Sequence, residues 1–181
     1  MNKTKEDRIQ ELRNFLETGY VETHYIDKLT KRLDDHGFFT APASTRFHGA
    51  YDGGLFDHSI MVAQKLVLMT RQMSLQWELV RSPYIVGILH DICKCDSYIK
   101  QEDGTYKYND KMLLTGHGDK SAILANSLMV LTEEETLCIR YHMGAYESED
   151  MWKNFGAAIG EYPNVLWTHS ADMYVSKVYE I

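Results

Sequence analysis

The dipeptide His90-Asp91 is the first feature of this sequence that could do chemistry. Imidazole and carboxylate are groups that bind Zn, Fe, Mn and related divalent ions. The dipeptide follows Tyr84 to Leu89, a stretch that is apolar apart from Gly87. An ionised Asp is costly to bury unless it is paired or bound to a cation. Taken alone, however, the dipeptide also fits the end of a buried helix that emerges into water.

Other histidine and aspartate residues favour a metal site over that simpler interpretation. His58 lies on the apolar face of its predicted helix, His117 begins a helix after Gly116, and His142 ends another. Asp172 lies inside the mainly apolar last helix. Six such groups exceed what one tetrahedral site needs, and they would suit two ions that share a bridging carboxylate. His117 and His142 could instead be ordinary polar residues at helix ends.

The spacing of apolar residues predicts an all-α protein that would position these groups. Helices are expected over residues 5–17, 22–35, 54–73, 82 to the His90-Asp91 pair, 117–131, 133–142, and from about 162 to the C-terminus. Ser82 is the expected N-cap of the fourth helix, and Thr132 opens a capping box for the sixth. Asp103-Gly104, between tyrosines, predicts a small β-hairpin insertion near residues 97–109.

Length and composition point to a single domain of residues 1–181, with N-terminal helices and a loop over 1–45 and a metal-binding helical core over 46–181. The net charge of −7 argues against binding to extended duplex nucleic acid. Three cysteines suggest neither a disulfide framework nor a zinc knuckle. Without an apolar signal core or a run of about twenty apolar residues, we expect a cytoplasmic protein that does not span a membrane.

The ordered set of motifs resembles the HD superfamily of metal-dependent phosphohydrolases, from about Arg46 to Lys177. The matching motifs are Gly54-Leu55-Phe56-Asp57-His58-Ser59, His90-Asp91-Ile92-Cys93-Lys94, Gly116-His117, His142 and Ala171-Asp172. The resemblance implies an HD-domain helical bundle. It assigns His58, His90, Asp91 and Asp172 to a first divalent ion. His117 and His142 match the extra ligands of members with two ions, where Asp91 would bridge. The ions could be Mn, Fe, Zn, Ni, Co or Mg.

Lys94 lies one helical turn after Asp91, and in similar proteins a lysine there contacts a substrate phosphate. Asp91 and Lys94 are therefore the predicted catalytic residues, although Lys94 could also be a solvated surface lysine. Weaker candidates for substrate binding are Arg46, His48, Lys120, Arg140 and His169. Each of these could equally make an ordinary surface or structural contact, and His169 could support Asp172 from one turn before it.

The expected reaction is hydrolysis of a phosphoester of a nucleotide or short oligonucleotide by metal-activated water. Phosphomonoesters, cyclic phosphodiesters and nucleoside triphosphates all remain open as substrates. One alternative is an HD-type di-iron oxygenase, in which a similar ligand set activates O2. Another is a regulatory module that binds a nucleotide without turnover. The helices before Arg46 could form a homo-oligomer surface or simply cover the core.

Overall fold

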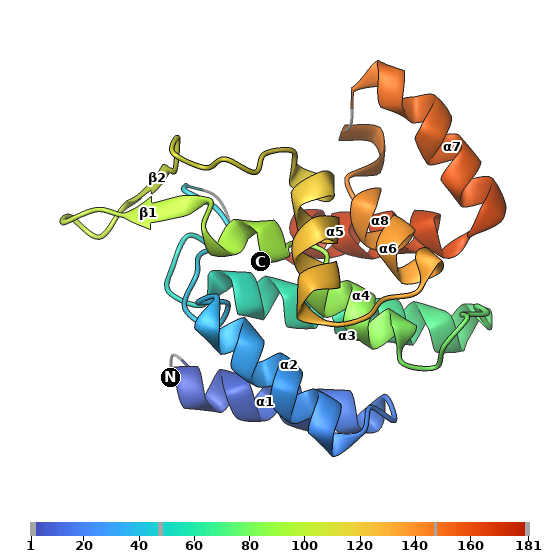
Figure 1. Ribbon diagram of the computed structural model, residues 1–181, viewed down its shortest axis with the longest axis horizontal. Coiled ribbons are helices and arrows are strands. Elements are labelled where there is room, and N and C mark those ends of the chain that lie inside the picture. The colour runs from blue at the N-terminus through green and yellow to red at the C-terminus, as the bar shows by residue number, and fades with distance from the viewer. Residues whose placement is uncertain (1–2, 47–48, 147, 180–181) are drawn as a thin grey trace.

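The computed structural model describes residues 3–46, 49–146 and 148–179 (Figure 1). Within these ranges the chain is predominantly helical, and its only two strands form one antiparallel hairpin. The all-α class with a small hairpin insertion is therefore confirmed. The α-helices are α1 (Lys5–Thr18), α2 (Thr23–Asp35), α3 (Gly54–Met73), α4 (Ser82–Leu89), α5 (His117–Leu128), α6 (Glu133–Arg140), α7 (Trp152–Glu161) and α8 (Asn164–Tyr174).

Shorter elements connect these helices. The 3-10 turns of the described residues are η1 (Ile92–Cys95), η2 (Gly144–Tyr146) and η3 (Glu149–Met151), and α8 continues into a π-helical turn, η4 (Val175–Tyr179). The strands β1 (Tyr98–Lys100) and β2 (Tyr106–Tyr108) pair so that Tyr98 lies opposite Tyr108. In Figure 1 the hairpin projects from one end of the molecule, away from the helices.

Helix α3 lies at the centre of the fold and packs most extensively against α4 (Figure 1). Helices α1 and α2 cover one side of this pair, whereas α5, α6 and α8 lie on the other. The fully buried rings of Phe38 and Phe39 pack against Phe56 of α3, with ring centroids 6.1 and 5.6 Å away. This aromatic cluster joins the segment after α2 to the central helix, at a place where burial of three large rings stabilises the contact.

Two glycines let the helices that carry the candidate ligands approach one another closely. A Cβ on Gly87 of α4 would lie 2.3 Å from Cα of Ala63 in α3, so any larger residue would separate these helices. A Cβ on Gly118 would lie 2.0 Å from the carbonyl oxygen of Arg140, at the crossing of α5 and α6. The first contact lies close to His58 and His90, and the second close to His117 and His142.

The helix starts were only partly predicted. Thr132 forms the expected capping box, because its hydroxyl accepts from the Glu135 amide and the Glu135 carboxylate accepts from the Thr132 amide. The prediction that Ser82 caps α4 is wrong. Arg81 holds the cap position, and the buried Ser82 hydroxyl donates to Glu135 Oε1 at 3.0 Å. The hydroxyl therefore serves a contact between α4 and α6 that local sequence does not reveal.

Several helix ends also differ from expectation. Helix α5 stops at Leu128 rather than residue 131, and α6 stops at Arg140, just before His142. Helix α7 was not predicted, although Phe155, Ala158 and Ile159 recur at helical spacing and pack against the core. Among the described residues, no helix combines the length and the apolar character that crossing a membrane requires.

Candidate metal centre

The Asp91 carboxylate lies between two groups of candidate ligands. Asp91 lies between His90, the last cap residue of α4, and the 3-10 turn η1, and its side chain is 3% exposed. Its Oδ2 lies 3.5 Å from Nε2 of both His58 and His90, while its Oδ1 lies 2.6 Å from Nε2 of His117. The two carboxylate oxygens thus face different histidines, as a bridging ligand requires.

The first group consists of His58, His90 and Asp172, each with one ligand atom within 4.8 Å of the others. Nε2 of His58 lies 3.3 Å from Nε2 of His90 and 3.2 Å from Oδ1 of Asp172. Helices α3 and α8 contribute one residue each, and His90 caps the C-terminus of α4. Together with Asp91, these are the residues that the family resemblance assigns to a first ion.

The second group consists of Asp91, His117 and His142, which lie within the same 4.8 Å limit. His117 is the first residue of α5, and His142 follows α6. Nε2 of His142 lies 3.4 Å from Oδ1 of Asp91, and the rings of His117 and His142 are 5.1 Å apart. The structure therefore brings together all six residues that the sequence singled out as metal ligands.

The backbone orients the buried imidazoles toward the centre. Nδ1 of His90 donates to the Gly87 carbonyl at 2.8 Å, and Nδ1 of His142 donates to the Ile139 carbonyl at 2.7 Å. A carbonyl can only accept, so each bond places the ring proton on Nδ1 and leaves a lone pair on Nε2 when the ring is neutral. Partners of this kind commonly hold metal-binding histidines in place.

The electrostatics of the site suit cation binding. Burial lowers the pKa of His90 to about 4, so its imidazole is neutral at neutral pH. Burial opposes ionisation of Asp91, but Lys94 and the surrounding imidazoles hold the pKa of that carboxyl well below its usual range. Asp172 behaves similarly: against the effect of burial, the hydrogen bond with His58 and the nearby imidazoles lower its pKa. Neutral imidazoles and ionised carboxylates are the forms that bind metals.

One orphaned atom supports the fit of these residues to a metal ion. Nε2 of His142 is fully buried and makes no hydrogen bond in the described part of the chain, although Asp91 Oδ1 lies 3.4 Å away. An unsatisfied buried nitrogen is costly, and a bound cation would satisfy it. With N and O donors from two adjacent groups, the residues present fit one or two divalent ions such as Mn, Fe, Zn or Co.

A cavity of about 310 Å³ opens beside the candidate ligands. Asp91, His117 and Asp172 line it, together with Lys94 and His169. Nζ of Lys94 lies 2.6 Å from Asp91 Oδ2. Although burial works against the charge, this carboxylate raises the pKa of Lys94, so the lysine is an ammonium at neutral pH.

His169 is held in the cavity wall by a hydrogen bond from Nδ1 to the His142 carbonyl at 2.8 Å. Gly144 makes room for its ring, because a Cβ there would lie 2.5 Å from the imidazole. Of the residues predicted to bind substrate, His169 is thus placed next to the candidate ligands.

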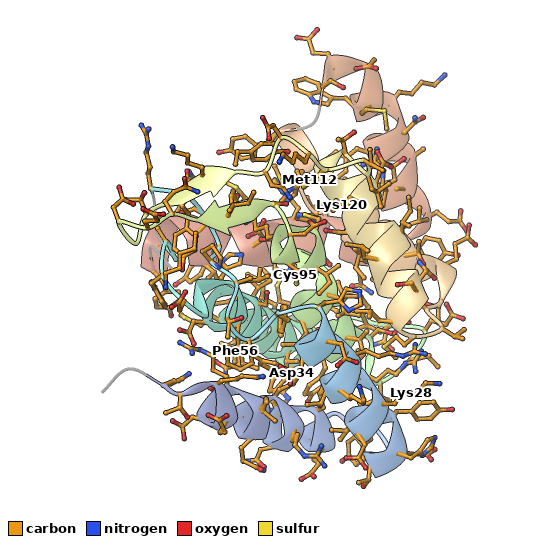
Figure 2. The ribbon with its side chains drawn as sticks, turned by 60° about the vertical axis from the view of Figure 1, so that its left-hand side comes forward. Lys28, Asp34, Phe56, Cys95, Met112 and Lys120 are labelled. Atoms are coloured by element: carbon orange, nitrogen blue, oxygen red, sulfur yellow. The ribbon has the colours of Figure 1, made fainter. Side chains whose placement is uncertain are left out.

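Of the other residues predicted to bind substrate, those that the structure describes do not line this cavity. Lys120 is buried in an ion pair with Asp96 and donates to the Met112 sulfur at 2.9 Å, and Figure 2 shows Met112 and Lys120 side by side. Arg140 pairs with Asp119 and lies over the Tyr141 ring. Arg46 is exposed before α3, and His48 lies outside the described residues. For these four residues, substrate binding stays a prediction.

Sequence reasoning missed two polar groups on the same cavity. Ser176 donates to Oδ1 of Asp172 at 3.2 Å, and Lys177 lines the cavity from the exposed end of the chain's last described helix. Both lie in η4, the π-helical continuation of α8. With His169, Asp172 and Met173 they recur at intervals of three and four residues, the spacing of one helix face, and this periodicity is the signal that could have found them.

A contact of Cys93 with His117 was also not foreseen. The Cys93 sulfur lies 3.3 Å from Nδ1 of His117, on the far side of the ring from Asp91. Cys93 is 2% exposed, and burial raises the pKa of its thiol to about 12. The adjacent sequence His-Asp-Ile-Cys-Lys contains this residue, but its partner becomes visible only once α5 is in place.

Comparison with known proteins gives a partial match. The chain is 38% identical over 73 residues to a dihydroneopterin 2',3'-cyclic phosphate phosphodiesterase from Methanocaldococcus jannaschii. The matched segment covers 39% of this chain and 29% of the relative, so most of that protein lies outside the similarity. No protein-family model matches the chain, and no solved structure shows a significant match.

Proposed function

We propose that this protein is a metal-dependent phosphohydrolase that cleaves a phosphoester of a small nucleotide-like substrate with water. The observation that carries the proposal is the position of Asp91, whose two carboxylate oxygens face two separate groups of histidine and aspartate side chains. Such a carboxylate can bridge two divalent ions, and paired ions are a recurrent arrangement in enzymes that hydrolyse phosphoesters.

When bound, the divalent ions would lower the pKa of a coordinated water and supply the nucleophile. Around them, this chain supplies the ligands His58, His90 and Asp172 on one side and His117 and His142 on the other, with Asp91 between the groups. Because the orphaned His142 nitrogen and the ionised carboxylates already point inward, the ligands need little rearrangement to bind.

Lys94 is the residue proposed to bind the phosphate. Its ammonium lies at the edge of the cavity within hydrogen-bond reach of Asp91, and its side chain is 18% exposed. A cation in this position can move to a non-bridging phosphate oxygen and stabilise the charge that develops there as the P–O bond breaks. His169 and Lys177 would contact other parts of the substrate from the cavity wall.

The cavity favours a small substrate. A volume of about 310 Å³ lies at the lower end of the range typical of small-molecule sites, which is about 300–1,000 Å³. Met143, Tyr146 and Met173 give it an apolar wall suited to a flat heterocycle. The partial relative is named for a cyclic phosphate of a pterin. We therefore favour a mononucleotide or pterin phosphate, monoester or cyclic diester, over an oligonucleotide.

The test begins with protein stripped of metal by a chelator and reloaded separately with Mn, Fe, Co, Ni, Zn or Mg. Bound metal is counted by elemental analysis. Each loaded form is then offered nucleoside monophosphates, 2',3'-cyclic nucleotides, triphosphates, cyclic dinucleotides and short oligonucleotides. We expect about two ions per chain and metal-dependent release of phosphate or opening of a cyclic phosphate.

Three results would contradict the proposal. Hydrolysis that persists in the stripped protein would exclude the metal mechanism. Tight nucleotide binding without product would indicate a regulatory module instead. Oxygen consumption that depends on iron and on an organic substrate would indicate an oxygenase.

A further inference from the structure

The chain of contacts from Cys93 through His117 to Asp91 sets His117 apart from two other candidate ligands. His90 and His142 each donate Nδ1–H to a backbone carbonyl, which is an acceptor only. His117 instead contacts a thiol, with 3.3 Å between Nδ1 and the Cys93 sulfur. A thiol can donate its S–H or accept at sulfur, so it does not by itself fix the His117 tautomer.

The difference is important because of the contact on the opposite edge of the His117 ring, at Nε2. Nε2 of His117 lies 2.6 Å from Oδ1 of Asp91, a distance at which the imidazole donates its Nε2–H to the carboxylate. A neutral ring with its proton on Nε2 has a lone pair on Nδ1, and there the Cys93 thiol must be the donor. Binding of a metal at Nε2 reverses this arrangement, since Nδ1 must then carry the proton and the sulfur must accept it.

The backbone holds the thiol in place for both arrangements. The Cys93 amide donates to the Ser121 hydroxyl at 3.3 Å, and the Ser97 hydroxyl donates to the Cys93 carbonyl at 2.7 Å. Ser121 lies one turn after His117 on α5, so this hydrogen bond links Cys93 to the helix that carries His117. The S–H bond can rotate while the sulfur stays beside the ring.

We propose that Cys93 is a positioning residue for His117, whose thiol changes from hydrogen-bond donor to acceptor as His117 exchanges its contact with Asp91 for a metal ion. This inference rests on the proposed metal centre. No net proton leaves the His117–Cys93 pair, because the ring proton moves between the two nitrogens by exchange with solvent and the thiol keeps its own. The ion bound by Asp91, His117 and His142 is accordingly the one whose affinity depends on Cys93.

The test compares Cys93→Ala and Cys93→Ser, with Cys95→Ala as the matched control in the same 3-10 turn. Serine keeps a group that both donates and accepts, whereas alanine removes it. Metal-free protein is titrated with Mn²⁺ by calorimetry, and circular dichroism melts verify folding. We expect Cys93→Ala to weaken binding of the second equivalent by about tenfold and leave the first unchanged, with Cys93→Ser and Cys95→Ala staying within about threefold of wild type.

A second readout follows the tautomer directly through long-range ¹⁵N spectra of the histidine rings, with Zn²⁺ as the diamagnetic ion. In metal-free wild type, His117 should carry its proton on Nε2, and after loading on Nδ1. Finding Nδ1–H or an imidazolium on His117 in the metal-free protein would overturn the inference. In the calorimetric titration, an unchanged affinity of Cys93→Ala for the second ion, or an equal loss of affinity for both ions, would also overturn it. Failure of the wild type to bind two ions would instead count against the proposed two-ion centre.

Discussion

Nζ of Lys94 lies 2.6 Å from Oδ2 of Asp91, which ties the proposed phosphate-binding cation to the proposed bridging carboxylate. The charges compensate each other in a site where Asp91 is almost fully buried. A cation bound by Asp91 would compete with Lys94 for that oxygen. Ion binding would therefore release the ammonium toward the cavity, where a phosphate can replace the lost partner.

Replacing Lys94 tests this relationship. We expect Lys94→Met to lower kcat/KM by about 10²–10³-fold, the usual cost of removing one charged or polar group that stabilises a developing oxyanion. Metal content should stay at the wild-type level or rise, because Lys94 no longer competes for Asp91. Steady-state kinetics and elemental analysis measure both effects. Lys153→Met, on the exposed surface of α7, is the control and should change neither.

Replacing Asp91 tests the bridging role. Asp91→Asn keeps the shape of the side chain but loses its charge, so both ligand groups lose a shared anion. We expect bound metal and activity to be lost while the helical circular dichroism spectrum is retained. Asp110→Asn, at an exposed position after the hairpin, should behave as wild type. Full activity of Asp91→Asn without bound metal would contradict the proposed mechanism.

Lys177 makes a more specific prediction about substrate binding. It lines the cavity without an ion pair in the described part of the chain, so its role would be attraction of an anionic part of the substrate. Lys177→Met should raise KM severalfold and leave kcat and metal content unchanged, because the residue lies away from the reacting bond. A fall in kcat with constant KM would show that this lysine acts in the chemical step.

The sequence could predict that the candidate ligands lie close together, because each lies within a helix or within two residues of a helix end. His58 lies on the buried face of α3, and His90 lies at the C-terminal end of the apolar helix α4. The hydrophobic periodicity therefore indicated the same positions as the metal-binding residue types. The hairpin was also predictable, from the Asp103-Gly104 pair. In the structure Gly104 has a left-handed φ of 83°, and Asp103 accepts a hydrogen bond from the Thr105 amide in the turn.

The contacts that complete the site were not predictable, because they depend on how helices cross. Ser82 was expected to cap a helix, yet its hydroxyl serves Glu135, 53 residues later. Lys120 is one turn after His117, but its ammonium turns to Asp96 and away from the cavity. Lys177 lines the cavity together with Met173, four residues before it, but only the position of α8 beside Asp91 shows that this helix face borders the site.

The close crossing of α5 and α6 predicts the effect of enlarging Gly118. A methyl group there would meet the Arg140 carbonyl, and the helices would have to separate. We expect Gly118→Ala to destabilise the protein by about 1–3 kcal/mol and to weaken the second metal equivalent. Gly160→Ala in α7 is the matched control, because its Cβ would meet no atom within 4 Å, and it should be neutral or stabilising. Chemical denaturation curves and metal titrations of the two variants would distinguish the effect of helix packing from the effect of helix propensity.

Asp52 predicts a pH-dependent contribution of the hairpin to stability. Hydrogen bonds from Lys100 at 2.6 Å and Tyr106 at 2.5 Å, with the charge of Lys100, hold the pKa of the Asp52 carboxyl below its ordinary value. A depressed pKa in the folded state means that this stabilisation is complete above the unfolded value near 4 and is lost as the pH falls through the folded value. Since the Asp52 side chain is 59% exposed, we expect Asp52→Asn to cost only about 0.5–1 kcal/mol at pH 7.

The measurement for Asp52 is the difference in unfolding free energy between wild type and Asp52→Asn from pH 7 to pH 3. The difference should be constant from pH 7 to about pH 5 and shrink toward zero below the folded pKa, because protonated Asp and Asn then present similar neutral groups to Lys100 and Tyr106. Lys100→Met should reduce the same difference at pH 7, since it removes one of the two donors. A difference that stays constant down to pH 3 would mean that Asp52 acts through packing, and its charge would then have no part in holding the hairpin against the loop before α3.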